Sequence, residues 1–213
     1  MSSDRPSDGP SSPAEPADSQ LGLAGALRTR GAPLVEGLER HQPGAREHAA
    51  GTASYAFATS VELGFERPQC EVARETAKLH EIGLVYVPAN LLGKPARERD
   101  ETEAEAFDGH FEAGYRLALG AGIPEHACEW LLRARERYDG AGPEGLAAEA
   151  IPIESRIIRA ACSCDTALAR AEDASDQRPA ALAIERLAGG AGNELDPRVV
   201  AGLTAILERA APN

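Results

Sequence analysis

Aromatic side chains and long apolar runs are both scarce in this sequence. Phe, Trp and Tyr together make up 4% of the residues, with a single Trp. Ala and Leu are abundant while β-branched residues occur singly or in pairs, and this balance favours packed helices over sheets. No stretch approaches the roughly 18 consecutive apolar residues that span a bilayer, so we expect no membrane-spanning segment.

Cysteine is also sparse, and its spacing excludes the common paired motifs. The four cysteines are Cys70, Cys128, Cys162 and Cys164, and no two of them have the C-x-x-C spacing of a zinc knuckle or a redox motif. The favoured interpretation is therefore that they are buried free thiols.

Basic residues are outnumbered by acidic ones. The sequence has 22 Lys and Arg against 34 Asp and Glu, which gives a formal net charge of -12. Such a chain repels a polyphosphate backbone, and its densest basic stretch, from Arg133 to Arg137, is short, so we expect no nucleic-acid partner.

The N-terminus lacks the basic and apolar regions of a secretory signal, and a cytoplasmic location is the default expectation.

The composition divides the chain into three parts. Residues 1–20 are rich in Ser, Pro and Asp without large apolar anchors, which predicts a disordered tail. Residues 21–43 hold two weak helical stretches, interrupted at Gly31 and Pro33, that we interpret as an N-terminal helical appendage. Residues 44–213 form the main domain.

Glycine and proline punctuate the main domain at regular intervals. Asp100 with Glu103 suits the start of one helix, and Asp196 before Pro197 suits the start of the last. The pattern predicts an all-α fold of about seven helices, over residues 45–63, 68–83, 100–120, 124–137, 152–171, 179–187 and 197–210. An extended loop is expected over residues 85–95 and a glycine-rich loop over residues 138–145.

Three of the five histidines share helix faces with apolar residues and are expected to point inward. They are His48, His80 and His110. Each alone is more typical of a hydrogen-bonded core histidine. Together, beside Glu81, they suggest a site for divalent metals of the kind that hydrolyse phosphoesters.

Several motifs in a fixed order resemble the HD-GYP family, the bacterial phosphohydrolases that linearise cyclic di-GMP, within the larger HD superfamily. The motifs are His48, LHEIGLVYVPANLLGKP from Leu79, FDGHFEAG from Phe107, ERYDGAGPEGL from Glu136, IPIESRII from Ile151 and ELDPRVV from Glu194. The resemblance covers about residues 44–209. It implies a helical bundle with a metal cleft in its middle and metal ligands at His48, His80 and His110.

The sequence departs from the family at several site positions. Where the family has the aspartate of its HD pair, this sequence has Glu81, and where the family has a lysine it has Leu84. Ala134 and Arg135 replace an adjacent pair of family histidines, Cys162 replaces an aspartate and Gly44 replaces a glutamate. The tyrosine of the family's G-Y-P motif is missing between Gly142 and Pro143. Asp165 keeps a second aspartate that is not a ligand. With these losses, we expect catalysis on cyclic di-GMP to be absent or very weak.

The leading hypothesis is a non-catalytic HD-GYP-type domain that acts in signalling by binding a protein partner or an anionic nucleotide such as a cyclic dinucleotide. Its candidate ligand-binding residues are Arg135, Asp139, Gly140 and Gly142. No metal, or one residual Zn, Fe or Mn ion, is expected among His48, His80, Glu81, His110 and Cys162. The alternative is a weakly active metal-dependent phosphohydrolase or phosphodiesterase. Two simpler interpretations stay open: Cys162 as a small apolar replacement, and Arg135 as a solvated surface residue.

Overall fold

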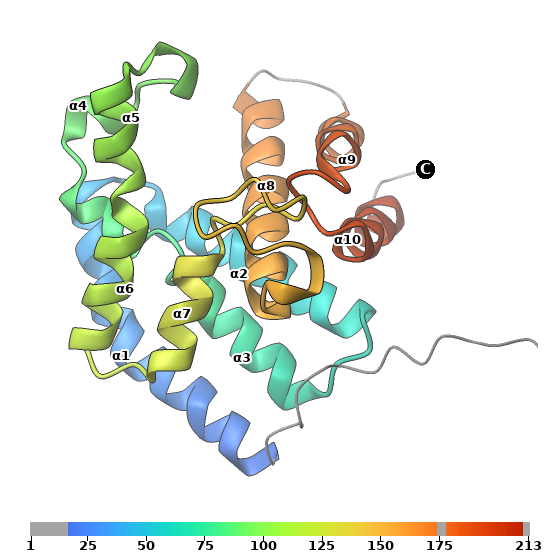
Figure 1. Cartoon of the computed structure of the whole chain (residues 1–213). Coiled ribbons are helices and arrows are strands. Elements are labelled where there is room, and N and C mark those ends of the chain that lie inside the picture. Colours follow the sequence, from blue (N-terminus) through green and yellow to red (C-terminus); the bar gives the residue numbers. More distant parts are fainter. Residues whose placement is uncertain (1–16, 174–177, 211–213) are drawn as a thin grey trace, which may run out of the picture.

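The computed structural model describes residues 17–173 and 178–210, and this part of the chain is built from helices (Figure 1). The α-helices are α1 Ala17–His41, α2 Ala45–Glu62, α3 Arg67–Ala77, α4 Ala89–Leu92, α5 Glu101–Asp108, α6 His110–Gly120, α7 Glu125–Arg133, α8 Ile153–Asp173, α9 Pro179–Gly190 and α10 Pro197–Ala210. Three short 3-10 helices are η1 Ile82–Tyr86, η2 Ala96–Glu98 and η3 Ala148–Ala150. Residues 17–173 and 178–210 contain no β-strand, which confirms the all-α prediction.

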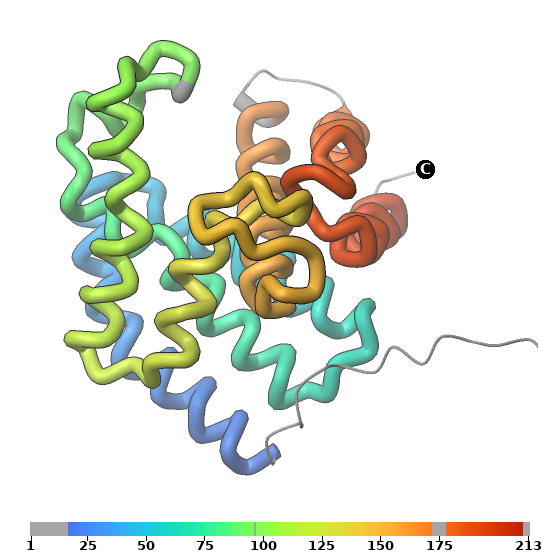
Figure 2. The backbone as a smooth tube through the Cα atoms, viewed as in Figure 1, coloured from blue at the N-terminus to red at the C-terminus, as the bar shows by residue number. Residues whose placement is uncertain are grey.

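Helices α2 and α8 pack against each other in the middle of the molecule, and the other elements surround them. Helix α3 lies along α2, with α1 packed on its other side. The path of the backbone shows α9 and α10 beside α8 at one side, and α4, α5 and α6 at the opposite side (Figure 2). One main apolar core joins these layers, with Leu27, Ile157 and Leu203 each almost fully buried. Among the described residues, no helix is both long enough and apolar enough to cross a membrane.

The N-terminal segment differs from the sequence expectation. Residues 17–41 form the single helix α1, so the predicted interruption at Gly31 and Pro33 is wrong, and residues 17–20 belong to a helix rather than to the predicted tail. The rest of that tail, residues 1–16, lies outside the described residues. Packing outweighs the low helix propensity of Gly31 and Pro33 here. Because Gly31 has no Cβ, α1 can lie against the side chain of Leu79. A Cβ at position 31 would lie only 2.6 Å from that side chain.

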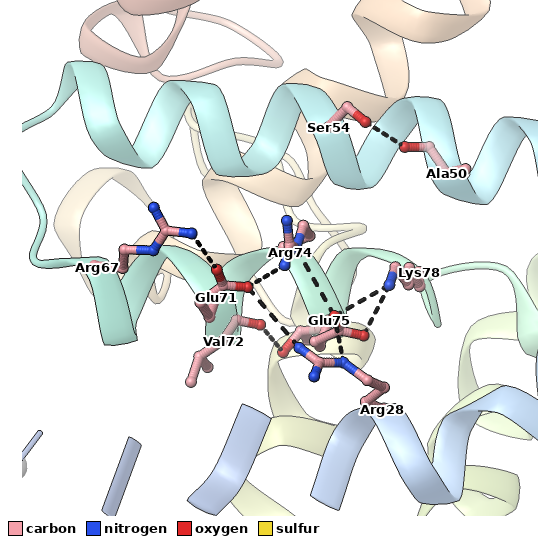
Figure 3. Close-up of polar contacts among 10 residues, drawn as sticks. Arg28, Ala50, Ser54, Arg67, Glu71, Val72, Arg74, Glu75 and Lys78 are labelled. Atoms are coloured by element: carbon pink, nitrogen blue, oxygen red, sulfur yellow. Dashed lines mark hydrogen bonds and ion pairs between the residues drawn. The ribbon is translucent and has the colours of Figure 1, made fainter. Parts of the chain in front are cut away.

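Ion pairs hold α1 against α3 (Figure 3). The carboxylate of Glu75, whose side chain is 2% exposed, accepts hydrogen bonds from the Arg28 Nε at 3.1 Å and from the Lys78 Nζ at 2.9 Å. Glu71, one turn earlier, accepts a hydrogen bond from Arg74 and lies 4.0 Å from the Arg28 guanidinium. A carboxylate this deeply buried requires charged partners, so Arg28 ties α1 into the bundle electrostatically as well as by apolar contact.

Two further helix boundaries also differ from expectation. The helix expected over residues 68–83 ends at Ala77, and the expected extended loop contains η1 and α4. The helix expected over residues 100–120 begins at the predicted Asp100 cap, which accepts a hydrogen bond from the Glu103 backbone N–H, but is divided at Gly109 into α5 and α6. The early end of α3 turns the chain so that His80 and Glu81 face α2.

Gly83 in η1 packs directly on the backbone of α6. A Cβ at this position would lie 1.9 Å from the carbonyl oxygen of His110 and 2.6 Å from the backbone nitrogen of Gly114. Backbone atoms cannot yield as a flexible side chain can, so only glycine is compatible with this contact.

We predict that Gly83→Ala lowers the free energy of unfolding by about 2 kcal/mol or more, because η1 and α6 must separate. Urea denaturation followed by circular dichroism measures the change. The matched control is Gly93→Ala, where the backbone has φ −86° and a Cβ would meet nothing within 4 Å. Equal stability of the two variants would contradict the prediction.

A buried ion pair joins α8 to the start of α10. Arg156 donates from Nη1 to the Asp196 Oδ2 at 2.5 Å, and their side chains are 10% and 0% exposed. The other carboxylate oxygen of Asp196 accepts from the Arg198 backbone N–H at 2.8 Å, which confirms the predicted cap of the last helix. Asp196 would therefore be an unpaired buried charge if Arg156 were lost.

Replacing Arg156 by Met is expected to destabilise the fold by about 3–5 kcal/mol, because the Asp196 carboxylate stays buried without its cation. The control is Arg209→Met, which removes the more exposed pair with Glu62 and should cost at most about 1 kcal/mol. Thermal or chemical denaturation of both variants tests this, and a loss below 1 kcal/mol for Arg156→Met would contradict it.

Candidate metal centre

Four of the five predicted metal ligands come together in the middle of the bundle. They are His48 from α2, His80 and Glu81 from the turn after α3, and Cys162 from α8. One ligand atom from each residue lies within 4.8 Å of the ligand atoms of the other three. The elements that carry them are far apart in sequence, so the cluster is a product of the fold.

Both imidazoles in the cluster are fixed through Nδ1. The Nδ1 of His48 lies 2.7 Å from the Asp165 Oδ2, and the Nδ1 of His80 lies 2.8 Å from the carbonyl oxygen of Ala77. Because a carboxylate and a carbonyl only accept hydrogen bonds, each Nδ1 carries a proton and donates it. The two Nε2 atoms then lie 3.2 Å apart and face the same point. A second ring nitrogen bound to a carboxylate or carbonyl is typical of histidines that ligate metals.

A glycine on α2 makes room for the carboxylate that orients His48. A Cβ at Gly51 would lie 1.9 Å from the Asp165 Oδ1, so no other residue leaves space for Asp165 at this point of the α2–α8 contact. Cys162 and Asp165 are three residues apart and share a face of α8. The same helix therefore supplies a candidate ligand and the residue that orients a ligand from α2.

The cluster shifts the acidities of its own members. Burial would lower the pKa of His48, but hydrogen bonds to Asp165 and Cys162 and the charge of Glu81 raise it to about 10. Burial would raise the pKa of the Cys162 thiol, but the neighbouring His80 and His48 lower it to about 7. The shift of the Cys162 pKa favours the thiolate, which is the form that binds metals, whereas the raised pKa of His48 favours its protonated form, from which a metal would have to displace the proton.

His110 does not join the four-residue cluster, which is the one group of potential metal ligands found among the described residues. It lies at the first position of α6, buried, with its ring 3.9 Å from the ring of Phe111. Its Nδ1 donates to the Phe107 carbonyl oxygen at 2.6 Å, and burial lowers its pKa, so the ring is neutral. The expectation that it ligates a metal stays a prediction.

Arg135 lies just after α7 and is half-buried. Its Nε is buried and has no hydrogen-bond partner among the described residues. The Nη1 of Arg159 on α8 donates to the carbonyl oxygens of Ala134 and Arg135, at 3.3 and 3.1 Å. The backbone of Arg135 is thus fixed while its guanidinium keeps an unused donor.

The glycine-rich loop is folded around a buried carboxylate. Glu136 is 1% exposed and accepts from the backbone N–H groups of Glu144 and Leu146, and a Cβ at Gly142 would lie 2.6 Å from its Oε2. Gly140 has φ +81°, a left-handed conformation that favours glycine. Asp139 is exposed, and its carboxylate is paired with Arg137 at 2.6 Å rather than free.

Comparison with known proteins places this arrangement in a family. The HD-domain family matches the chain over residues 34–199. The chain belongs to the HD-domain family. The match begins inside α1, so the expected domain boundary at residue 44 stays a prediction.

Similar curated proteins act on cyclic dinucleotides. The HD domain described here is 32% identical over 174 residues to RpfG, a cyclic di-GMP phosphodiesterase response regulator of Xanthomonas campestris, covering 80% of this chain and 45% of that protein. It is also 32% identical over 114 residues to the 3'3'-cGAMP-specific phosphodiesterase 1 of Vibrio cholerae, covering 53% of this chain and 26% of that protein. The chain thus spans less than half the length of these relatives.

Solved structures share the fold. Bd1817, an HDG"Y"P protein from Bdellovibrio bacteriovorus, matches with a TM-score of 0.63 and 16% identity over 90% of this chain and 62% of that chain. The PgpH HD domain of L. monocytogenes, in complex with cyclic-di-AMP, matches with a TM-score of 0.60 and 18% identity over 85% of this chain and 98% of that chain.

The four-residue cluster of this HD domain offers the donors that one metal ion needs. Two imidazoles, a carboxylate and a thiol are enough ligands for one four-coordinate ion. A second ion would need donors beside them, but the positions that the family resemblance assigns to a histidine pair hold Ala134, which has none, and the cation Arg135.

Sequence reasoning missed three residues that shape this site: Gly51, Arg159 and Glu136. The first two act through contacts between segments remote in sequence, for which the chain gives no local signal. Glu136 does carry a signal, since a carboxylate before a tight glycine-rich loop is well placed to accept the loop's backbone N–H groups.

Glu136→Gln should destabilise the HD domain by about 1–3 kcal/mol, because an amide offers one acceptor oxygen where two backbone N–H groups need acceptors. Glu149→Gln is the control, since its exposed side chain accepts from the Tyr138 hydroxyl and an amide oxygen can replace the carboxylate there. Urea denaturation compares the two, and an unchanged midpoint for Glu136→Gln would show that the loop does not depend on this carboxylate.

Proposed function

We propose that this HD domain is a non-catalytic, HD-GYP-type signalling domain that binds an anionic nucleotide of the cyclic dinucleotide class and holds at most one divalent metal ion. The observation that carries the proposal is the buried Nε of Arg135, which has no partner among the described residues, at a position that the family resemblance assigns to a histidine. The names of the curated relatives support the ligand class.

An arginine can replace one of the two roles that metals have in phosphoester hydrolysis. Bound metals generate hydroxide and also neutralise the charge of the phosphate. The guanidinium of Arg135 supplies fixed positive charge and directional donors to phosphate oxygens, but it cannot activate water. A site with Arg135 in place of ligands to a second ion is therefore suited to binding rather than hydrolysis.

The surroundings of Arg135 suit the binding of an anionic ligand. The Nη1 of Arg159 donates to the backbone carbonyl oxygen of Arg135, which holds in place the stretch of main chain that carries the guanidinium. The candidate residues Asp139, Gly140 and Gly142 would shape the lip of the site, with Asp139 acting through its pairing with Arg137. The net charge of -12 opposes long-range attraction of an anion, so the affinity has to arise from these local contacts.

A cytoplasmic location belongs to the same proposal. The four cysteines are all free thiols, and three of them are buried. Thiols persist in the reduced state in the cytosol, whereas an oxidising compartment would expose Cys162 to modification.

The second candidate is a weakly active metal-dependent phosphohydrolase, and the four-donor cluster favours it. A single ion beside a bound phosphate ester can act as a Lewis acid. The two candidates differ in turnover: the first predicts bound nucleotide that is recovered intact, and the second predicts slow release of a linear product.

Calorimetric titration with cyclic di-GMP tests the proposal. Binding should weaken by about 10- to 100-fold in Arg135→Ala, because a charge-assisted hydrogen bond contributes about 1.5–3 kcal/mol. Arg116→Ala is the matched control: it changes the net charge equally on an exposed part of α6, where Arg116 pairs with Glu112. Chromatography of the nucleotide after incubation with Mn²⁺ or Zn²⁺ should recover it uncleaved.

Each contrary result has a distinct meaning. Absent binding, or binding equal in Arg135→Ala and the parent, overturns the nucleotide proposal and leaves a protein partner as the ligand of this domain. Cleavage of cyclic di-GMP that requires added metal favours the phosphohydrolase.

A further inference from the structure

A cavity of about 230 Å³ lies between α1, α2 and α3, on the face of the bundle where α1 packs. Its apolar part includes Leu27 and Leu79, which are both buried. Three cations line the same cavity: Arg28 from α1, Arg46 from α2 and Lys78 at the end of α3. An apolar cavity of about 150 Å³ is large enough to bind benzene. This cavity can therefore hold one large apolar side chain beneath a positively charged rim.

The face beside the cavity carries more positive charge than its own ion pairs need. Four cations share two buried carboxylates of α3, Glu71 and Glu75, the second of which also lines the cavity (Figure 3). These cations are Arg28, Arg67, Arg74 and Lys78. The half-buried pair, Arg74 and Lys78, is enough to balance both carboxylates, so the more exposed Arg28 and Arg67 are in surplus. In a chain of net charge -12, such a face is an exception.

The arginines of α3 are restrained before any ligand binds. The guanidinium groups of Arg67 and Arg74 lie over the ring of Phe57, at 5.7 and 5.1 Å from its centroid. The Nε of Arg74 is buried and has no hydrogen-bond partner among the described residues. A cation that is already held in place loses less side-chain entropy when it binds an anion. This part of the surface is therefore prepared for negatively charged groups.

We propose that α1, α3 and the first turns of α2 form a docking surface for an acidic peptide segment of a partner protein. One large apolar side chain of the segment fills the cavity, and carboxylates on either side of it pair with Arg28, Arg46 and Arg67. Arg46 already pairs with Glu36 at 2.9 Å, but both side chains are at least half exposed, so a ligand carboxylate can replace this partner. The proposal goes beyond the proposed function and does not depend on whether Arg135 binds a nucleotide.

The spread of the cations selects an extended ligand. Helix α3 has 11 residues, which at about 1.5 Å per residue is about 16 Å of helix between Arg67 at its start and Lys78 just after its end. A small anion can reach only one end of this row. A peptide can span it while it presents an apolar side chain to the cavity at the Lys78 end. Charge complementarity with the surplus cations favours an acidic segment and speeds its association.

Selection from a random peptide library displayed on phage tests the proposal, with the immobilised full chain as bait. The enriched peptides should carry one large apolar residue with Asp or Glu on both sides of it. One such peptide is then synthesised with a fluorescent label, and its anisotropy measures the dissociation constant. Binding should weaken as salt is added, because exposed charge pairs are screened.

Filling the cavity should remove the place of the apolar side chain. Ala50→Trp introduces a large ring at an exposed cavity residue of α2 and should weaken peptide binding at least about tenfold. Ser54→Trp is the matched control, because Ser54 is exposed one turn further along α2 and does not line the cavity (Figure 3). If circular dichroism shows that Ala50→Trp is unfolded, Ala32→Trp fills the cavity from an exposed position of α1.

The surplus charge is tested separately. Arg67→Ala should weaken peptide binding by about two- to fivefold, the size expected for one exposed charge pair. Arg116→Ala is the matched control and should leave binding unchanged. Arg116 is exposed and pairs with a glutamate one turn away, as Arg67 does, but it lies on α6.

Three results would overturn the proposal: no peptide is enriched over the bare support, the enriched peptides lack acidic residues, or the labelled peptide binds equally to the parent and to the variant with the filled cavity. A concentration-dependent dimer of the parent that Ala50→Trp abolishes in sedimentation would also overturn it. That result would show that a second copy of this chain covers the face instead of a partner protein.

Discussion

The hydrogen bond between His48 and Asp165 connects the two central helices of this HD domain at the point where its candidate metal centre lies. Most of the α2–α8 interface is apolar, and a polar pair inside it is stable only with its partners satisfied and room for its atoms. Gly51 provides that room. The orientation of His48, its distance to His80 and the place of Cys162 all follow from how these two helices approach each other.

The helices and the inward histidines could be predicted from the sequence because their signals are local. Asp100 with Glu103 and Asp196 before Pro197 are caps whose chemistry acts over three residues, and both are present in the structure. The apolar face of His48 likewise depends only on helical periodicity, whereas His80 lies in the turn after α3, beyond the end of the helix that was expected to carry it. Long-range packing decided the rest: α1 stays continuous through Gly31 and Pro33 because it lies on α3 and on Leu79, which no local rule reveals.

The residues that gather in the cluster could be named from the sequence, but their geometry could not. The sequence suggested five metal ligands, and the structure brings ligand atoms of four of them within 4.8 Å of one another, while His110 donates to the Phe107 carbonyl oxygen near the end of α5. Asp139 is expected to line a ligand site, which stays a prediction, and its carboxylate is paired with Arg137 in the loop. The hydrogen-bond partners of His110 and Asp139 are features of the folded chain that spacing along the sequence does not show.

The order of events during folding follows from the separation of the site's residues along the chain. The His48–Asp165 hydrogen bond joins residues 117 positions apart, whereas the His48–His80 contact spans 32. Closing a longer loop costs more chain entropy, by about 0.6 kcal/mol for each doubling of its length. The cluster is complete only when α8 has docked on α2, so an ion would meet all four candidate ligands together only in chains that have already acquired their native topology.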